Sequence, residues 1–108
     1  MPVRHVSALE LRDYLDQCGE PPLLLDVRED WEFEICRIEG STHMPMSGII
    51  ESYPSLDSEQ ETVVICHHGM RSLQVAEFLA NAGFKRVLNL SGGIDAWSRE
   101  VDSGVPIY

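Results

Sequence analysis

The sequence predicts an α/β fold in which a mostly parallel sheet carries helices on both faces. Three short apolar runs, 23–27, 62–65 and 87–90, are typical of strands buried on both sides. Segments with helical spacing of apolar residues separate these runs. Strands that alternate with helices over short connections imply right-handed crossovers, and therefore a parallel sheet. The 108 residues match the size of one domain, so we expect residues 1–108 to form a single unit.

The first half of the chain is expected to contain two helices around one strand. Ser7-Ala8-Leu9-Glu10 has a capping-box pattern, and apolar residues follow at helical spacing as far as Gln17. Pro21-Pro22 ends that helix before the apolar run 23–27. The stretch 29–35 places aromatic residues among acids and favours a short helix. Glycines and prolines between 40 and 54 then predict loops and short turns.

The second half predicts a strand, a tight loop and a helix, followed by another strand and helix. Residues 62–65 are rich in β-branched side chains, as strands are. The loop 66–70 precedes a helical stripe of apolar residues that Gly83 ends. After the strand 87–90, Gly92-Gly93 opens the last helix.

Charge and cysteine content exclude several classes of function. Eighteen acidic and eight basic side chains give a net charge of −10, which repels nucleic acid and anionic lipid. No apolar run approaches the roughly 20 residues of a membrane-spanning helix, and charged residues occupy the place of a signal peptide's apolar core. Three cysteines without paired spacing suit a reducing compartment. We therefore expect a cytoplasmic protein that binds neither nucleic acid nor membranes.

Cys66 is the candidate nucleophile, because it stands where a buried strand meets its loop. In open parallel sheets the functional crevice lies outside the carboxyl ends of the strands. Successive backbone N–H groups from His67 to Arg71, together with the start of the next helix, form an anion-binding nest that favours a thiolate. Arg71 adds a planar cation suited to an oxyanion. An isolated cysteine is more often a small buried apolar residue. The ordered glycine, arginine and helix start favour the nucleophile instead.

These residues resemble the rhodanese-like (sulfurtransferase) family. The central motif is Cys66-His67-His68-Gly69-Met70-Arg71-Ser72. Three other segments are similar to that family in the same order: Leu25-Asp26-Val27-Arg28-Glu29 with Glu32-Phe33, Ile38-Glu39-Gly40-Ser41-Thr42-His43-Met44-Pro45, and Gly92-Gly93-Ile94-Asp95-Ala96-Trp97. The family's glycine-histidine pair is replaced by Cys36-Arg37. The resemblance implies a doubly wound fold around a central five-stranded parallel sheet.

The resemblance also implies a sulfurtransferase in which Cys66 cycles between thiolate and persulfide. A small anionic donor such as thiosulfate would bind the loop residues His67, His68, Gly69, Met70, Arg71 and Ser72. Sulfite would leave, and the sulfur would pass to cyanide in an assay, or to a thiol or sulfur-carrier protein in a cell. Such chemistry requires no metal or organic cofactor. We expect a monomer or weak dimer.

Several other polar residues are expected to support the loop. Asp26 and Arg28, at a strand end, suit salt bridges and backbone hydrogen bonds that fix loop geometry. His43 either faces the pocket or, as we favour, hydrogen-bonds a loop carbonyl. His67 and His68 remain open between pocket and packing roles, and we expect no metal site, because neighbouring side chains on a tight loop point apart.

Two further expectations concern the other cysteines and an acidic run. We favour a structural role for Cys36, with use as a resolving thiol as the alternative, and no role in the chemistry for Cys18. Cys36 precedes a strand, which places it at the sheet edge opposite Cys66, and Cys18 lies beside a helix end. The acidic run 29–34 is typical of a solvated face.

Two alternative functions keep the same fold features. Cysteine phosphatases, and with them arsenate reductases, also place a thiolate and an arginine around an anion cradle, and they have five residues between the two. Only four residues separate Cys66 from Arg71, which favours a smaller cradle. A non-catalytic interaction module with the rhodanese fold is the other alternative.

Overall fold

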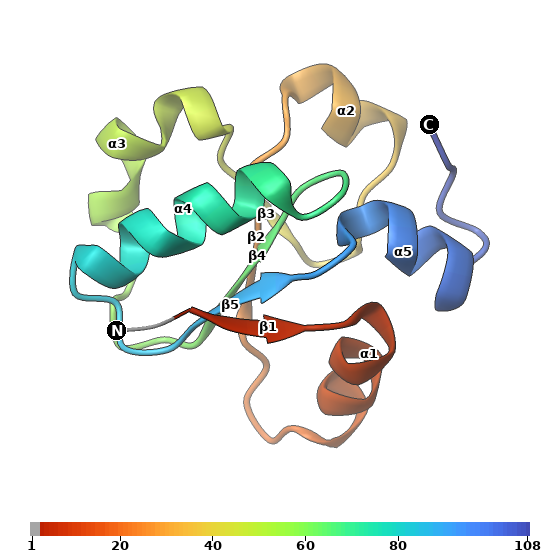
Figure 1. Ribbon diagram of the computed structural model, residues 1–108, viewed down its shortest axis with the longest axis horizontal. Coiled ribbons are helices and arrows are strands. Elements are labelled where there is room, and N and C mark those ends of the chain that lie inside the picture. The colour runs from red at the N-terminus through yellow and green to blue at the C-terminus, as the bar shows by residue number, and fades with distance from the viewer. Residues whose placement is uncertain (1–2) are drawn as a thin grey trace.

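The computed structural model describes residues 3–108, which form a five-stranded parallel sheet between two layers of helices (Figure 1). The strands are β1 (Arg4–Val6), β2 (Leu23–Asp26), β3 (Thr42–His43), β4 (Thr62–Ile65) and β5 (Val87–Leu90), in the spatial order β1-β5-β4-β2-β3. Each neighbouring pair is parallel. The α/β class and the five-stranded parallel sheet are therefore confirmed.

Four of the five described helices match the expected segments closely, and the remaining one is a four-residue helix where loops and short turns were expected. The helices are α1 (Ala8–Gln17), α2 (Asp30–Ile35), α3 (Ile49–Ser52), α4 (Met70–Asn81) and α5 (Gly93–Glu100), with short 3-10 turns on either side of α3. The Ser7 hydroxyl accepts a hydrogen bond from the Glu10 N–H at 3.1 Å, and the Ser7 N–H donates to the Glu10 carboxylate at 2.9 Å. The capping box predicted at the start of α1 is thus formed. Within residues 3–108, no helix is long and apolar enough to cross a membrane.

Two clusters of buried apolar side chains hold the helices to opposite faces of the sheet. Alternation along each strand sends Val63 and Ile65 toward α1 and α5, and Val64 toward α3 and α4. Cys66 belongs to the second cluster, on the α4 side. Full cover on both faces explains the nearly continuous apolar runs in the sequence.

Two strands, both at the edges of the sheet, are not predicted by the apolar runs: β3, which has two residues, and β1. The three residues of β1 include Arg4 and His5, which are exposed, and β1 pairs with β5 at one edge of the sheet. An edge strand with charged side chains has no apolar run to mark it.

Candidate active site

Cys66 directly follows β4 at the carboxyl edge of the sheet and is 1% exposed. Its Sγ accepts a hydrogen bond from the Gly69 N–H at 3.0 Å and donates to the Ser72 hydroxyl at 3.2 Å. The Ser72 hydroxyl donates in turn to the Asn89 carboxamide oxygen, and the Asn89 amide donates to the Gly69 carbonyl at 3.2 Å. Asn89, on β5, closes a ring of hydrogen bonds around the sulfur. Asn89 was not among the predicted site residues, although a polar residue within the apolar run 87–90 was a usable signal.

Two glycines allow the loop to lie against the start of α5. Gly69 has φ +103, and a Cβ there would crowd backbone atoms of Leu90 and Gly92. Gly93 has φ +61, and a Cβ there would collide with the carbonyl groups of Cys66 and His67. The loop carbonyls accept hydrogen bonds from the first turn of α5: Cys66 from Ile94 at 2.8 Å and His67 from Asp95 at 3.1 Å. Close backbone contact therefore holds the loop against the start of α5.

Arg71 lies in the first turn of α4 and is held by Glu32 of α2. Its two terminal nitrogens lie 2.6 and 2.8 Å from the two Glu32 carboxylate oxygens. The hydrogen bonds from Arg71, opposed by burial, lower the pKa of Glu32 to about 2, so the pair is charged at neutral pH. Arg71 was expected to present this fork to an oxyanion. In the structure the fork binds a carboxylate instead, because α2 places Glu32 within reach of the first turn of α4.

Glu32 also differs from the expectation of a solvated acidic face. It is only 3% exposed, whereas its neighbours Trp31 and Glu34 are exposed. One turn of α2 directs Glu32 inward toward Arg71. The Tyr108 hydroxyl donates a hydrogen bond to the same carboxylate at 2.8 Å. Charge in a sequence does not show which face of a short helix is buried, and the arginine that compensates Glu32 lies 39 residues away.

Asp26 and Arg28 form a buried ion pair beneath the site, as expected. Both side chains are fully buried, and the Arg28 guanidinium lies 2.7 Å from the Asp26 carboxylate. Arg28 also donates to the carbonyl oxygens of Glu32 and Cys36, at 3.1 and 2.6 Å. His43 Nε2 lies 2.7 Å from the Arg28 carbonyl oxygen, which is the loop contact that we favoured. These residues join the ends of β2 and β3 to α2.

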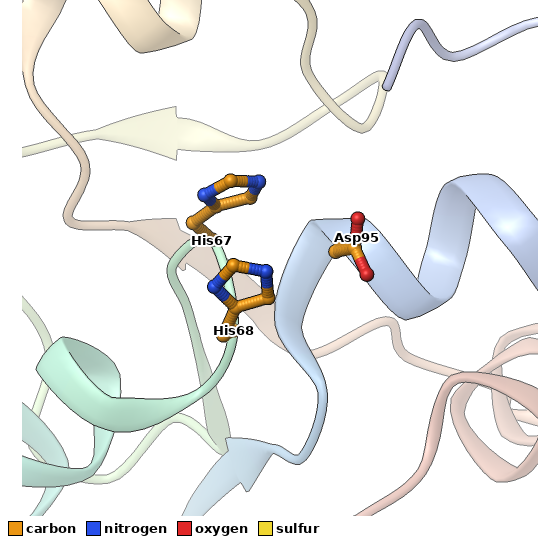
Figure 2. A group of neighbouring side chains, drawn as sticks. All are labelled: His67, His68 and Asp95. Carbon is orange, nitrogen blue, oxygen red and sulfur yellow. The ribbon is translucent and has the colours of Figure 1, made fainter. Parts of the chain in front are cut away.

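His67 and His68 stack against each other instead of pointing apart, which corrects the expectation. Their ring centroids lie 4.0 Å apart, and the other face of His67 stacks on Tyr108, also at 4.0 Å. Figure 2 shows both rings on the loop before α4, with Asp95 beside them on α5. Burial, and then the charge of His68, lower the pKa of His67 below its ordinary value. Burial therefore favours the neutral form of His67, which packs against an aromatic ring.

The same group raises the question of a metal ion, because ligand atoms of His67, His68 and Asp95 lie within 4.8 Å of one another. Imidazole lone pairs lie in the ring plane, so two stacked rings do not direct their nitrogens at one ion. The Asp95 carboxylate is also engaged by Arg99 at 3.0 Å. The arrangement fits a metal poorly, and the expectation of no metal site stays a prediction.

Cys36 lies elsewhere than expected. It is buried, and its Sγ lies 3.8 Å from a terminal nitrogen of Arg28, just beyond the carboxyl end of β2. It therefore lies at the same carboxyl edge of the sheet as Cys66, although it packs in the cluster on the opposite face, because α2 carries the chain over that edge before β3 begins. Cys18 is half-buried at the end of α1, where its Sγ lies 3.6 Å from the Leu15 carbonyl oxygen.

Comparison with known proteins agrees with this architecture. The family model for the rhodanese-like domain matches residues 7–100, and the chain belongs to that family. It is 38% identical over 100 residues to the putative sulfurtransferase YtwF of Bacillus subtilis (strain 168), covering 93% of this chain and 95% of that protein. The crystal structure of a rhodanese-like domain protein from Staphylococcus aureus superposes with a TM-score of 0.84 at 28% identity, covering 98% of this chain and 99% of that one.

Longer relatives contain this unit as a part. The adenylyltransferase and sulfurtransferase MOCS3-1 of Zea mays is 36% identical over 111 residues, which cover 94% of this chain and 24% of that protein. Across the longer relatives the chain spans between 23% and 38% of their length.

Proposed function

We propose that this protein is a sulfurtransferase that carries sulfane sulfur as a persulfide on Cys66. The observation that carries the proposal is the Gly69 N–H, which donates to Cys66 Sγ at 3.0 Å from the amino end of α4. A backbone donor at a helix start stabilises negative charge on the sulfur it faces. Relatives named as sulfurtransferases support the same reaction class.

In the first half-reaction the Cys66 thiolate attacks the outer sulfur of a donor such as thiosulfate. A bond forms between Sγ and that sulfur, the sulfur–sulfur bond of thiosulfate breaks, and its electron pair leaves with sulfite. We assign the binding of the anionic group to the loop N–H groups and the start of α4. Because Arg71 is already paired with Glu32, its part is to hold the first turn of α4 in place.

In the second half-reaction a nucleophile takes the terminal sulfur and returns Cys66 to the thiolate. Cyanide gives thiocyanate in an assay. A thiol or a sulfur-carrier protein is the acceptor that we propose in a cell. All three cysteines are free thiols, which fits a reducing compartment; a cytoplasmic location and a monomer or weak dimer stay predictions.

Intact mass spectrometry tests the proposal. After incubation with thiosulfate and removal of the donor, the wild-type protein should gain one sulfur atom, and cyanide should remove it. Cys66→Ser should gain none, whereas the controls Cys18→Ser and Cys36→Ser should behave as wild type. A wild-type protein that takes up no sulfur from thiosulfate or from a small persulfide would favour the non-catalytic interaction module. A persulfide found on Cys36 in place of Cys66 would identify Cys36 as the reactive thiol instead.

A further inference from the structure

We infer that Tyr108 is a positioning residue for the Cys66 loop, which it holds through Glu32 on one side and through His67 on the other. The inference rests on the proposed sulfur transfer and adds a residue to it. Tyr108 lies outside the family match at residues 7–100, and it follows α5 by eight residues.

The hydroxyl of Tyr108 has a defined direction. It accepts a hydrogen bond from Arg28 Nη1 at 3.0 Å and lies 2.8 Å from Glu32 Oε2. An arginine can only donate, so the single phenolic proton must point to Glu32. Burial and the hydrogen bond to Glu32, opposed by Arg28, raise the pKa of Tyr108 to about 12, so that this proton stays in place at neutral pH.

The hydrogen bond from the Tyr108 hydroxyl completes the set of donors around the Glu32 carboxylate. Glu32 Oε1 accepts from Arg71 and from the Glu29 N–H at 3.0 Å, while Oε2 accepts from Arg71 and from Tyr108. A continuous set of charge-assisted bonds therefore runs from buried Arg28 through Tyr108 and Glu32 to Arg71. Arg71 lies in the first turn of α4, immediately after the loop that carries Cys66. Bonds of this kind are short and directional, so they restrict the carboxylate and the arginine that it holds.

The ring of Tyr108 acts on the loop from a second direction. It stacks on His67 with an interplanar angle of 7°, and Trp31 meets its edge at a centroid distance of 6.0 Å. His67 is the residue next to Cys66, and its other face stacks on His68. The ring therefore limits how the loop moves away from α5, while the hydroxyl limits how α4 moves. Tyr108 acts on Cys66 through these neighbours, which makes its role one of positioning.

Two substitutions separate the ring from the hydroxyl. Tyr108→Phe keeps the stack on His67 and removes the bonds to Arg28 and Glu32, whereas Tyr108→Leu removes both. Tyr14→Phe is the matched control, because the Tyr14 hydroxyl also donates to a carboxylate, Glu61, on the α1 side away from Cys66. The first readout is the steady-state rate with thiosulfate and cyanide.

For Tyr108→Phe we expect kcat to fall about ten-fold with KM changed by less than about two-fold, because a misplaced reactive group costs rate more than affinity. Tyr108→Leu should lose more, and Tyr14→Phe should retain wild-type activity. Equal activity of Tyr108→Phe and Tyr14→Phe would overturn the inference. A rise in KM with an unchanged kcat would also overturn it, because that result would indicate that Tyr108 touches the donor.

A second readout does not depend on turnover. In NMR spectra the Gly69 amide, which faces Cys66 Sγ, should shift in Tyr108→Phe and stay unchanged in Tyr14→Phe. The His67 ring signals should move in Tyr108→Leu, because the stacked ring is lost. An unchanged Gly69 amide in Tyr108→Phe would overturn the positioning role even in an active enzyme. If wild type shows no sulfur transfer while these shifts occur, the proposed function fails and the positioning of the loop stands.

Discussion

Arg71 and Glu32 form a two-pronged ion pair, with both terminal nitrogens of the arginine spent on one carboxylate at 2.6 and 2.8 Å. The carboxylate is almost fully buried, and 34% of the arginine side chain remains exposed. The cation that ends the Cys66 loop is thus anchored to α2. Its contribution to sulfur transfer should come from the geometry of α4 rather than from direct contact with the donor.

Arg71→Ala should therefore slow sulfur uptake from thiosulfate and from a neutral persulfide donor by the same factor, about ten-fold. Arg71→Lys should recover part of the rate, because an ammonium replaces the charge and not the fork. Persulfide formation followed by mass spectrometry under single-turnover conditions measures both donors. A much larger loss with thiosulfate would instead show that Arg71 holds the departing sulfite.

Stability should fall in acid as Glu32 is protonated. Its pKa is lowered from 4.5 to about 2 in the folded protein, so the stabilisation is complete above about pH 5 and is lost as the pH falls toward 2. The shift corresponds to at most about 3 kcal/mol. Urea unfolding of wild type and Glu32→Gln at pH 7 and pH 3.5 measures the stabilisation that the ionised Glu32 provides.

The difference in unfolding free energy between wild type and Glu32→Gln should shrink at the lower pH. Glu10→Gln serves as the control, since Glu10 is an exposed carboxylate in the capping box of α1. A Glu32→Gln protein with the same pH dependence as wild type would rule out this carboxylate as the source.

Gly93→Ala should destabilise the fold and disturb the Cys66 loop together. The new Cβ would meet the carbonyl groups of Cys66 and His67 at a residue with φ +61, which we expect to cost about 3 kcal/mol. Gly83→Ala is the matched control, because Gly83 also has positive φ and no atom within 4 Å of the added Cβ. It should lose about 1 to 2 kcal/mol from backbone strain alone. Equal losses of stability in urea would contradict the close contact.

Loop length should separate sulfurtransferase from phosphatase chemistry. A glycine inserted after Gly69 places five residues between Cys66 and Arg71, and the enlarged loop must leave its contact with Gly92 and Leu90. Thiosulfate sulfurtransferase activity should fall, and a weak aryl phosphatase activity is the gain to look for. Wild type should show the first activity and essentially none of the second. Rapid aryl phosphate hydrolysis by wild type, without sulfur uptake, would replace the proposed function by the phosphatase alternative.

The sequence was sufficient for the three central strands and for the position of Cys66 at a strand end, because both depend on local pattern. Strands buried on both faces need continuous apolar runs, and β4 ends where the polar loop begins. The cap of α1 also follows from residues three positions apart. Strand β1 was missed because an edge strand of three residues carries no such pattern.

The setting of Cys66 depended instead on contacts between residues far apart in the chain. Asn89 reaches Ser72 from β5, Glu32 reaches Arg71 from α2, and Tyr108 reaches both Glu32 and His67 from the end of the chain. A charged or polar residue carries no mark of its partner when the two are tens of residues apart, and burial, which decides whether the pair forms, exists only after the sheet has assembled. The sequence by itself therefore determined Cys66 as the candidate thiol, while the tertiary structure decided which groups surround it.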